Sequence, residues 1–310
     1  MSVTFRHNRL AVLTLGVFLG AVSGVCAQDV RVETQQQART RSENALGDSE
    51  TSESPSDPEL GDINLVSRAP KPKMFTLATV QALNYTNNAF LVRDGEQSDF
   101  FWNGRVGASF VPYATRNFTP TLSFTQDWFR YDDFTELDFD AQTLVMDFKY
   151  DLNRDDTWYV DGSYSLARLS SPDTGEFYRY GFLNGSITHV IQMQTAPATL
   201  WLTAGTYWRH GDPSPSDRIS GYVSFSAAYN ICDKVQASVF ARPEWQHYTH
   251  DPAGSREDAN LTLGASITWQ PHPDVAVVAT GSYIGNWSSV GERKYNLLTP
   301  SLIFAAKIAF

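Results

Sequence analysis

The chain has 310 residues and a formal net charge of −10 at pH 7, with 34 acidic side chains against 24 basic ones. This acidic balance argues against nucleic acid as a partner. A mean hydropathy of −0.31 would ordinarily argue against a membrane protein. A β-barrel with a polar lumen carries only alternate residues in lipid, so it is compatible with this value.

The first 27 residues have the pattern of a secretory signal peptide. Two arginines precede an apolar run over residues 10–22, and small residues at its end predict cleavage after Ala27. The run is too short to span a bilayer as a helix. Its removal takes the formal charge from −10 to −12, because residues 1–27 contain two Arg and no acid. A lipid anchor on Cys26 is the alternative, although Val25 is a poor residue immediately before a lipidated Cys.

Residues 28–73 contain no aromatic side chain and are dominated by Gln, Ser, Glu, Asp and Pro. Such a segment cannot bury enough apolar surface to offset its ordering entropy, so we predict a disordered periplasmic tether. One alternative is a tether that folds back and occludes the following domain. Mixed charges suit that alternative and occur at Arg31, Glu33, Arg39, Arg41 and Glu43. We favour a plain spacer.

A second domain is predicted over residues 74–310, where composition changes sharply. All of the 8 Trp, 14 Tyr and 19 Phe residues lie there except Phe5 and Phe18. Turn signals divide this domain into alternating segments. Tight turns are predicted at 113–117, 152–156, 194–198, 232–234 and 270–274, and looser connections around 89–99, 131–140, 169–176, 210–217, 249–257 and 289–294. Eleven connections join twelve strands, and the even number places both ends of the domain on the periplasmic side.

The alternation within these segments has a period of two, which indicates strands with one apolar and one polar face. Residues 260–270 show it most clearly, and residues 219–231 and 235–245 repeat it. Residues 75–88 and 137–143 alternate poorly, so we expect β-bulges or a changed register there. The predicted fold class is all-β: a transmembrane antiparallel β-barrel of about twelve strands.

Tryptophans near the predicted strand ends on the outward parity suit the two aromatic girdles of a membrane barrel, because amphipathic rings prefer the headgroup layer. They are Trp102, Trp128, Trp158, Trp208, Trp245, Trp269 and Trp287. The alternative is a soluble β-sandwich with core tryptophans.

The inner parity carries nearly balanced charges, which predict a lumen without strong ion selectivity. They are Arg105, Asp127, Asp147, Lys149, Asp161, Arg209, Arg242, Glu244 and Lys307. The predicted hairpins bring Arg105 beside Asp127, and Asp147 and Lys149 beside Asp161. Paired charges in a narrow barrel act either as structural struts or as the wall of an aqueous path. We favour struts, since twelve strands enclose a smaller lumen than sixteen.

No catalytic site, cofactor or metal is predicted. Asp132-Asp133 and His250-Asp251, in two predicted loops, resemble the acidic and His-Asp pairs of the omptin proteases, so a rim hydrolase is an alternative. His189 is expected on the barrel surface and His272 in a turn, and no Cys/His cluster has metal-ligand spacing. With cleavage after Ala27, Cys232 is the only thiol, and we expect it to be buried or in a turn.

The last strand has its own signature. Leu302, Phe304, Ile308 and Phe310 share one parity, and Lys307 lies on the other. This ending resembles the C-terminal signature of bacterial outer-membrane β-barrels. The resemblance implies outer-membrane lipid and the barrel-assembly machinery as partners.

A second resemblance lies near the start of the domain. The sequence Tyr-Thr-Asn-Asn-Ala-Phe-Leu at 85–91 and Ser-Asp-Phe at 98–100 resemble the start of porin-like barrel proteins associated with exopolysaccharide export. The resemblance implies a channel and carries over no catalytic residue. We therefore predict an outer-membrane porin or a channel component of an envelope export system, which would have a periplasmic partner. A closed scaffolding barrel that binds a periplasmic partner through its tether is the alternative.

Overall fold

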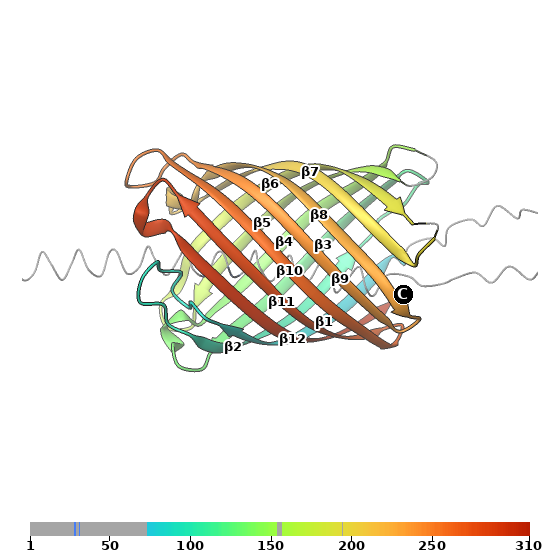
Figure 1. The fold of residues 1–310 in the computed structure, drawn as a ribbon, viewed down its shortest axis with the longest axis horizontal. Helices are drawn as coiled ribbons and strands as arrows, with labels where there is room; N and C mark the ends of the chain where they lie inside the picture. The colour runs from blue at the N-terminus through green and yellow to red at the C-terminus, as the bar shows by residue number, and fades with distance from the viewer. Residues whose placement is uncertain (1–27, 29–30, 32–72, 154–156, 194) are drawn as a thin grey trace, which may run out of the picture.

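The computed structural model describes residues 28, 31, 73–153, 157–193 and 195–310. Twelve antiparallel strands form one closed barrel in which every strand pairs with its sequence neighbours and β1 pairs with β12 (Figure 1). The strands are β1 (Phe75–Thr86), β2 (Asp99–Phe110), β3 (Phe118–Tyr131), β4 (Phe139–Asp151), β5 (Trp158–Ser171), β6 (Gly175–Gln192), β7 (Ala198–Asp212), β8 (Arg218–Cys232), β9 (Val235–Tyr248), β10 (Arg256–His272), β11 (Val275–Ser288) and β12 (Tyr295–Ala309). The prediction of a twelve-stranded antiparallel barrel is confirmed.

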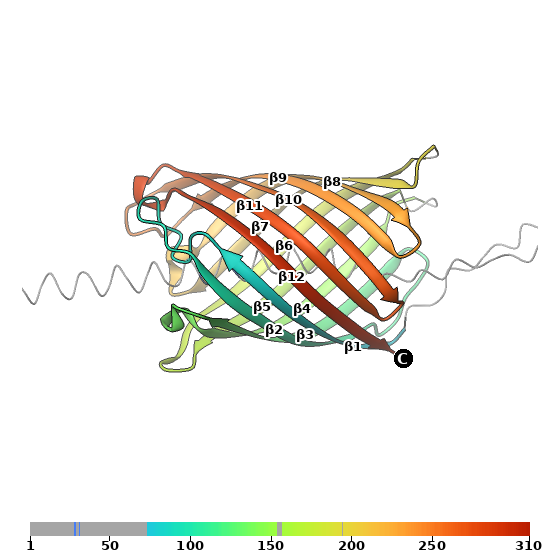
Figure 2. The same ribbon diagram turned by 60° about the horizontal axis from the view of Figure 1, so that its bottom comes forward.

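The two ends of the barrel differ in their connections. β1 begins where the chain ends, and the Phe75 backbone N–H donates to the Phe310 carbonyl at 2.9 Å. We call this the terminal end, and it carries the connections that follow the even-numbered strands. We call the opposite end the loop end. It carries the six connections that follow the odd-numbered strands, at 87–98, 132–138, 172–174, 213–217, 249–255 and 289–294 (Figure 2). Three of these contain short 3-10 helices: Thr135–Leu137, Ser214–Ser216 and Gly291–Arg293.

Side chains alternate between the outside and the inside of the barrel, as the period of two requires. Large apolar side chains are exposed on the outward parity, including Phe304 at 46% and Ile308 at 68%. Polar and charged side chains on the other parity are buried, including Asp127 at 1% and Arg209 at 0%. The barrel is therefore apolar outside and polar inside. Within the described residues, no helix is long and apolar enough to cross a membrane.

The bulges expected in residues 75–88 and 137–143 are absent from the described strands there. β1 and β4 pair in continuous register with both neighbours. Register shifts occur instead between β5 and β6 near Leu169, between β8 and β9 near Cys232, and between β10 and β11 near His272. The physical reason is that β1 and β4 carry apolar side chains on both faces. Ala82 packs inside the barrel and Phe139 belongs to an interior cluster, so hydropathy does not alternate although the backbone is regular.

The signal peptide predicted at 1–27 and nearly all of the tether predicted at 28–73 lie outside the described residues. The periplasmic orientation of the terminal end remains a prediction.

Candidate functional site: the barrel lumen

The middle of the lumen contains a buried ion pair. β2 places Arg105 directly opposite Asp127 on β3, and the Arg105 Nε lies 2.5 Å from the Asp127 Oδ1. Both side chains are at most 5% exposed. A charge buried this deeply requires its partner, because removal from water costs several kcal/mol per ion. The hairpin predicted from the sequence brings these residues beside one another, and the observed register places them face to face.

The terminal end of the lumen contains a cluster of carboxylates around one lysine. Lys149 on β4 faces Asp161 on β5, and Asp147 lies two residues earlier on the same face. The Lys149 Nζ makes its ion pair with Asp151, at 2.8 Å, and lies 4.6 Å from the centre of the Tyr159 ring. The Lys149 side chain is 40% exposed, so this end of the lumen is open to water. Lys307, also on the inward parity, lies opposite Ala78 near the same end.

Arginines and tyrosines line the wall formed by β6 to β9. The Arg209 guanidinium lies 3.8 Å from the centre of the Tyr180 ring, and that of Arg242 lies 3.9 Å from Tyr222. Arg242 also forms an ion pair with Glu244 at 2.8 Å. Glu244 accepts a short hydrogen bond from the Tyr207 hydroxyl, which in turn accepts one from the Arg218 Nε at 3.2 Å. Cation–π contacts and charge-assisted hydrogen bonds thus fix this wall from strand to strand.

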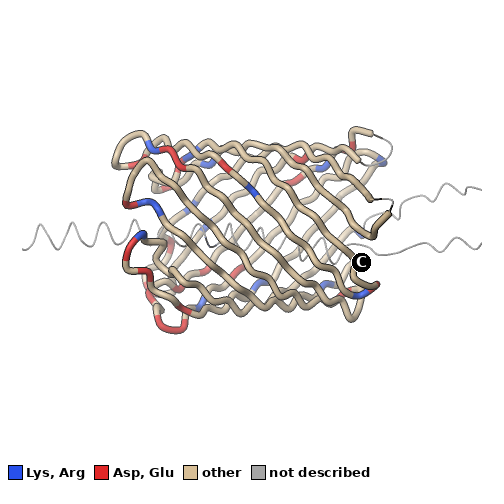
Figure 3. The backbone as a smooth tube through the Cα atoms, in the orientation of Figure 1, with Lys and Arg blue, Asp and Glu red and all other residues tan. Residues whose placement is uncertain are grey.

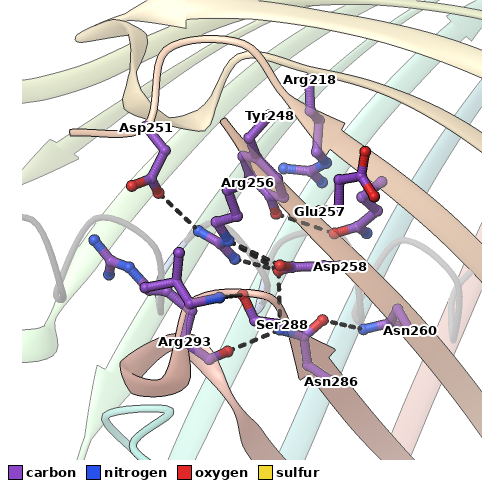
Figure 4. Close-up of polar contacts among 12 residues, drawn as sticks. Arg218, Tyr248, Asp251, Arg256, Glu257, Asp258, Asn260, Asn286, Ser288 and Arg293 are labelled. Atoms are coloured by element: carbon purple, nitrogen blue, oxygen red, sulfur yellow. Dashed lines mark hydrogen bonds and ion pairs between the residues drawn. The ribbon is translucent and has the colours of Figure 1, made fainter. Parts of the chain in front are cut away.

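A second buried arginine site lies at the loop end, on β9 to β11. Arg256 contacts Asp258 through its Nε and Nη2 and lies 3.2 Å from Asp251 (Figure 4). Asn286 donates to Asp258 at 3.0 Å, and the Arg256 guanidinium stacks over the Tyr248 ring at 3.9 Å. One arginine is therefore the shared ion-pair partner of two buried carboxylates.

Several of these groups were missed in the sequence. Arg218, Arg256 and Asp258 share the inward parity of their strands. Arg256 lies within the connection predicted at 249–257, and Arg218 and Asp258 lie just before the alternating segments recognised at 219–231 and 260–270. Continuing the alternation of 219–231 by one residue finds Arg218. Figure 3 shows acidic and basic residues concentrated toward the loop end, where these residues lie.

Next to the arginine wall, apolar side chains fill part of the lumen at the loop end. A cluster of buried residues extends over β2 to β6 and includes Phe101, Phe129, Phe139, Leu169 and Tyr178. The Phe129 and Phe139 rings stack with centres 4.2 Å apart. This cluster was not predicted, because its residues also fit the apolar composition of a lipid-facing strand. It narrows the loop end of the lumen.

Two residues from the predicted tether also lie inside the barrel. Arg31 is 1% exposed and Gln28 is 7% exposed. The Arg31 Nη2 donates to the Thr86 Oγ1 and to the Asn88 carbonyl, both at 2.8 Å. The Gln28 Nε2 donates to the Leu137 carbonyl at 3.3 Å. At these two residues the chain is packed against the lumen wall.

No protein-family model matches this chain, and no curated protein sequence matches it. Solved structures do match. A crystal structure of an outer membrane channel from Pseudomonas putida F1 aligns with a TM-score of 0.54 at 13% identity, covering 76% of this chain and 96% of the other. The translocator domain of the autotransporter NalP from Neisseria meningitidis aligns with a TM-score of 0.46 at 12% identity, covering 76% and 88%. A bacterial polysaccharide outer membrane secretin aligns with a TM-score of 0.44 at 9% identity, covering 74% and 98%.

The chain has the fold of outer-membrane β-barrels. The predicted fold resemblance is confirmed, and the alternative of a soluble sandwich is wrong because the sheet closes on itself. On the outer surface of the barrel, the predicted tryptophans other than Trp128 are 37% to 52% exposed, and Trp128 is partly exposed. The eighth, Trp201, faces inward opposite Ser226.

Of the residues considered for a rim hydrolase, His250 and Asp251 are engaged in other contacts. His250 lies 3.3 Å from Asp217, and Asp251 pairs with Arg256. His189 stacks on Trp158 with ring centres 4.2 Å apart. Cys232 is exposed at the end of β8, beside the turn into β9. Among the described residues, no group of three or more His, Cys, Asp or Glu side chains is placed to hold a metal ion.

Proposed function

We propose that this barrel is an outer-membrane channel for passive passage of small polar solutes. The observation that carries the proposal is the contrast between an apolar exterior and a lumen with charged groups along its length, from Asp161 at the terminal end to Arg256 at the loop end. Such a lumen offers hydrogen-bond partners and paired charges to a hydrated solute. The path would be lined by the residues predicted from the sequence and, in addition, by Arg218 and Arg256.

Two features of the wall suit solutes with both polar and flat apolar faces. Arginines stacked on tyrosines lie on β6 to β10, and the cluster around Phe129 lies on β2 to β6. A sugar or a small organic acid presents such faces. An export role with a periplasmic component is a narrower form of this proposal and rests on the resemblance at residues 85–100.

Reconstitution in a planar bilayer tests the channel. Heat-modifiable, folded protein should give discrete current steps after addition to one chamber. Because Arg31 lies in the lumen, the same measurement should be made on Arg31→Ala. Folded barrels that pass no current in either form would refute the channel.

A closed scaffolding barrel is the second candidate, and the filled loop end of the lumen favours it. Phe129 and Arg31 are both at most 1% exposed there. In this case residues 28–73, after removal of a signal peptide at 1–27, would bind a periplasmic partner. A pull-down from periplasmic extract should compare the mature chain with one that lacks residues 28–73. Loss of a specific partner on truncation, together with absence of current, supports the scaffold, and retention of every partner argues against it.

A further inference from the structure

The strongest unexplained feature of the lumen is the burial of Arg31. Its side chain belongs to a stretch whose composition favours disorder, yet it is 1% exposed within the barrel. The Nη2 donates to the Thr86 Oγ1 and the Asn88 carbonyl at 2.8 Å each, and the Nη1 lies 3.5 Å from the Thr299 Oγ1. The guanidinium also lies 5.5 Å from the centre of the Phe101 ring.

These four groups form a site of defined chemistry. Three oxygen acceptors meet the planar donors of a guanidinium, and an aromatic ring covers part of it. The acceptors come from the seam where β1 meets β12, and Phe101 comes from β2. Within the described residues, no carboxylate forms an ion pair with Arg31. Neutral acceptors therefore hold the cation. Because no ion pair offsets its removal from water, the guanidinium is held less firmly than a buried ion pair would hold it.

The site is built without help from Arg31. The Asn88 side chain donates to the carbonyls of Val92 and Asn296, at 2.7 and 3.1 Å, and accepts from the Val92 N–H. These bonds fix the β1–β2 loop and hold the Asn88 carbonyl toward the lumen. Phe101 is held by stacking on Tyr131, with ring centres 5.1 Å apart. A preorganised set of acceptors is what a binding site requires.

Gln28 adds a second contact on another part of the wall. Its amide donates to the carbonyl of Leu137, in the short helix between β3 and β4. The chain thus meets the lumen wall both at the β1–β12 seam and at the β3–β4 connection. Both contacts lie at the loop end.

We propose that the loop end of the lumen contains a guanidinium-binding site, formed by Thr86, Asn88, Thr299 and Phe101, which the chain fills with its own Arg31. Occupation of the site closes the loop end of the path, and release of Arg31 opens it. A small solute that bears a guanidinium group binds at the same place. This inference rests on the proposed channel for its effect on passage, but the binding site itself does not.

Thiol labelling tests occupation without any assay of transport. Thr299→Cys, in a Cys232→Ser background, places a thiol beside the Arg31 guanidinium. A water-soluble maleimide should label it at least tenfold faster when Arg31→Ala is added, with mass spectrometry to assign the label. Arg93→Ala, at an exposed arginine of the same barrel end, is the control and should leave the rate unchanged. A labelling rate that stays the same when Arg31→Ala is added would overturn the proposal.

Chemical rescue tests the specificity of the site. In planar bilayers, Arg31→Ala should pass at least several times the mean current of the natural chain. Methylguanidinium should block the Arg31→Ala current at lower concentration than methylammonium, because the ammonium lacks the planar fork of donors. Adding Thr86→Val should weaken this block, while Thr143→Val, at another buried threonine, should not. Equal block by both cations, or a block unaffected by Thr86→Val, contradicts a guanidinium site.

The two sets of results separate this inference from the proposed channel. Fast labelling only in Arg31→Ala, with no current from any variant, supports the site and refutes the channel. If the natural chain and Arg31→Ala are labelled at the same rate and pass the same current, the site is refuted and the channel is supported.

Discussion

The two ends of the lumen use charge differently. At the loop end, Arg256 and its partner Asp258 have side chains 6% and 0% exposed. At the terminal end, Lys149 and its partner Asp151 have side chains 40% and 13% exposed. A buried charge depends on its partner because neither can return to water, whereas a wet charge remains solvated when its partner is lost. We therefore expect the loop end to determine stability and the terminal end to influence the passage of ions.

The largest expected effect is the loss of Arg256. Arg256→Ala leaves Asp251 and Asp258 buried without their cation, so it should lower the free energy of unfolding by about 3–5 kcal/mol. Lys149→Ala should lower it by about 0–1 kcal/mol, because its partner remains in contact with water. Urea titration of tryptophan fluorescence in lipid vesicles measures both. Equal losses for the two variants would remove the distinction between the ends.

The next effect concerns packing rather than charge. Leu169 is 0% exposed within the apolar cluster of the loop end, and Leu169→Ala should cost about 2–5 kcal/mol because a cavity remains. Leu302 is 39% exposed on the outward face. Leu302→Ala should cost about 0–1 kcal/mol, since lipid is as apolar as the side chain it replaces. The same urea titration measures the loss of unfolding free energy for both variants. A larger loss for Leu302→Ala than for Leu169→Ala would mean that the interior cluster is loosely packed.

A smaller effect is expected on ion preference at the terminal end. One charge about 7 Å from a passing ion in water contributes about 0.6 kcal/mol, favourable for one sign of ion and unfavourable for the other, which is about a sevenfold change in the relative permeability of cations and anions. Lys149→Ala should favour cations and Asp161→Asn should favour anions. Reversal potentials under a salt gradient, in the Arg31→Ala background, measure the change. A shift of the same sign for both variants contradicts this prediction.

The strands themselves could be predicted from the sequence because a strand with one lipid-facing side must alternate. Residues 260–270 show this directly, and their partners on β9 and β11 follow in register. The outward residues of β12, such as Phe304 and Ile308, could be assigned for the same reason. Turns were found because Pro, Gly, Asn and Asp interrupt the alternation.

The loop end of the lumen could not be predicted in this way. Phe129 and Tyr178 face inward, although aromatic side chains are also common on a lipid-facing surface. Only the strand register shows which way they point. Arg256 contacts Asp251 and Asp258 within a short stretch that composition alone assigns to a loop. Arg31 has no sequence pattern that distinguishes it from Arg39 or Arg41. Its acceptors Thr86 and Thr299 belong to the first and last strands in the sequence of the barrel domain, and only the closed barrel brings them together.

The smallest effect is expected where both members of a buried pair are removed together. Arg105→Leu leaves Asp127 buried without its partner and should cost about 3–5 kcal/mol, as should Asp127→Leu. The double replacement removes both charges and fills the space with apolar side chains beside the cluster around Phe129. Its cost should be within about 1 kcal/mol of zero, because no buried charge remains to be desolvated. Urea titration of the two single variants and the double variant completes a double-mutant cycle. Additive costs would mean that Arg105 and Asp127 are stabilised independently, by water in the lumen, and that the dry region of the loop end stops short of this pair.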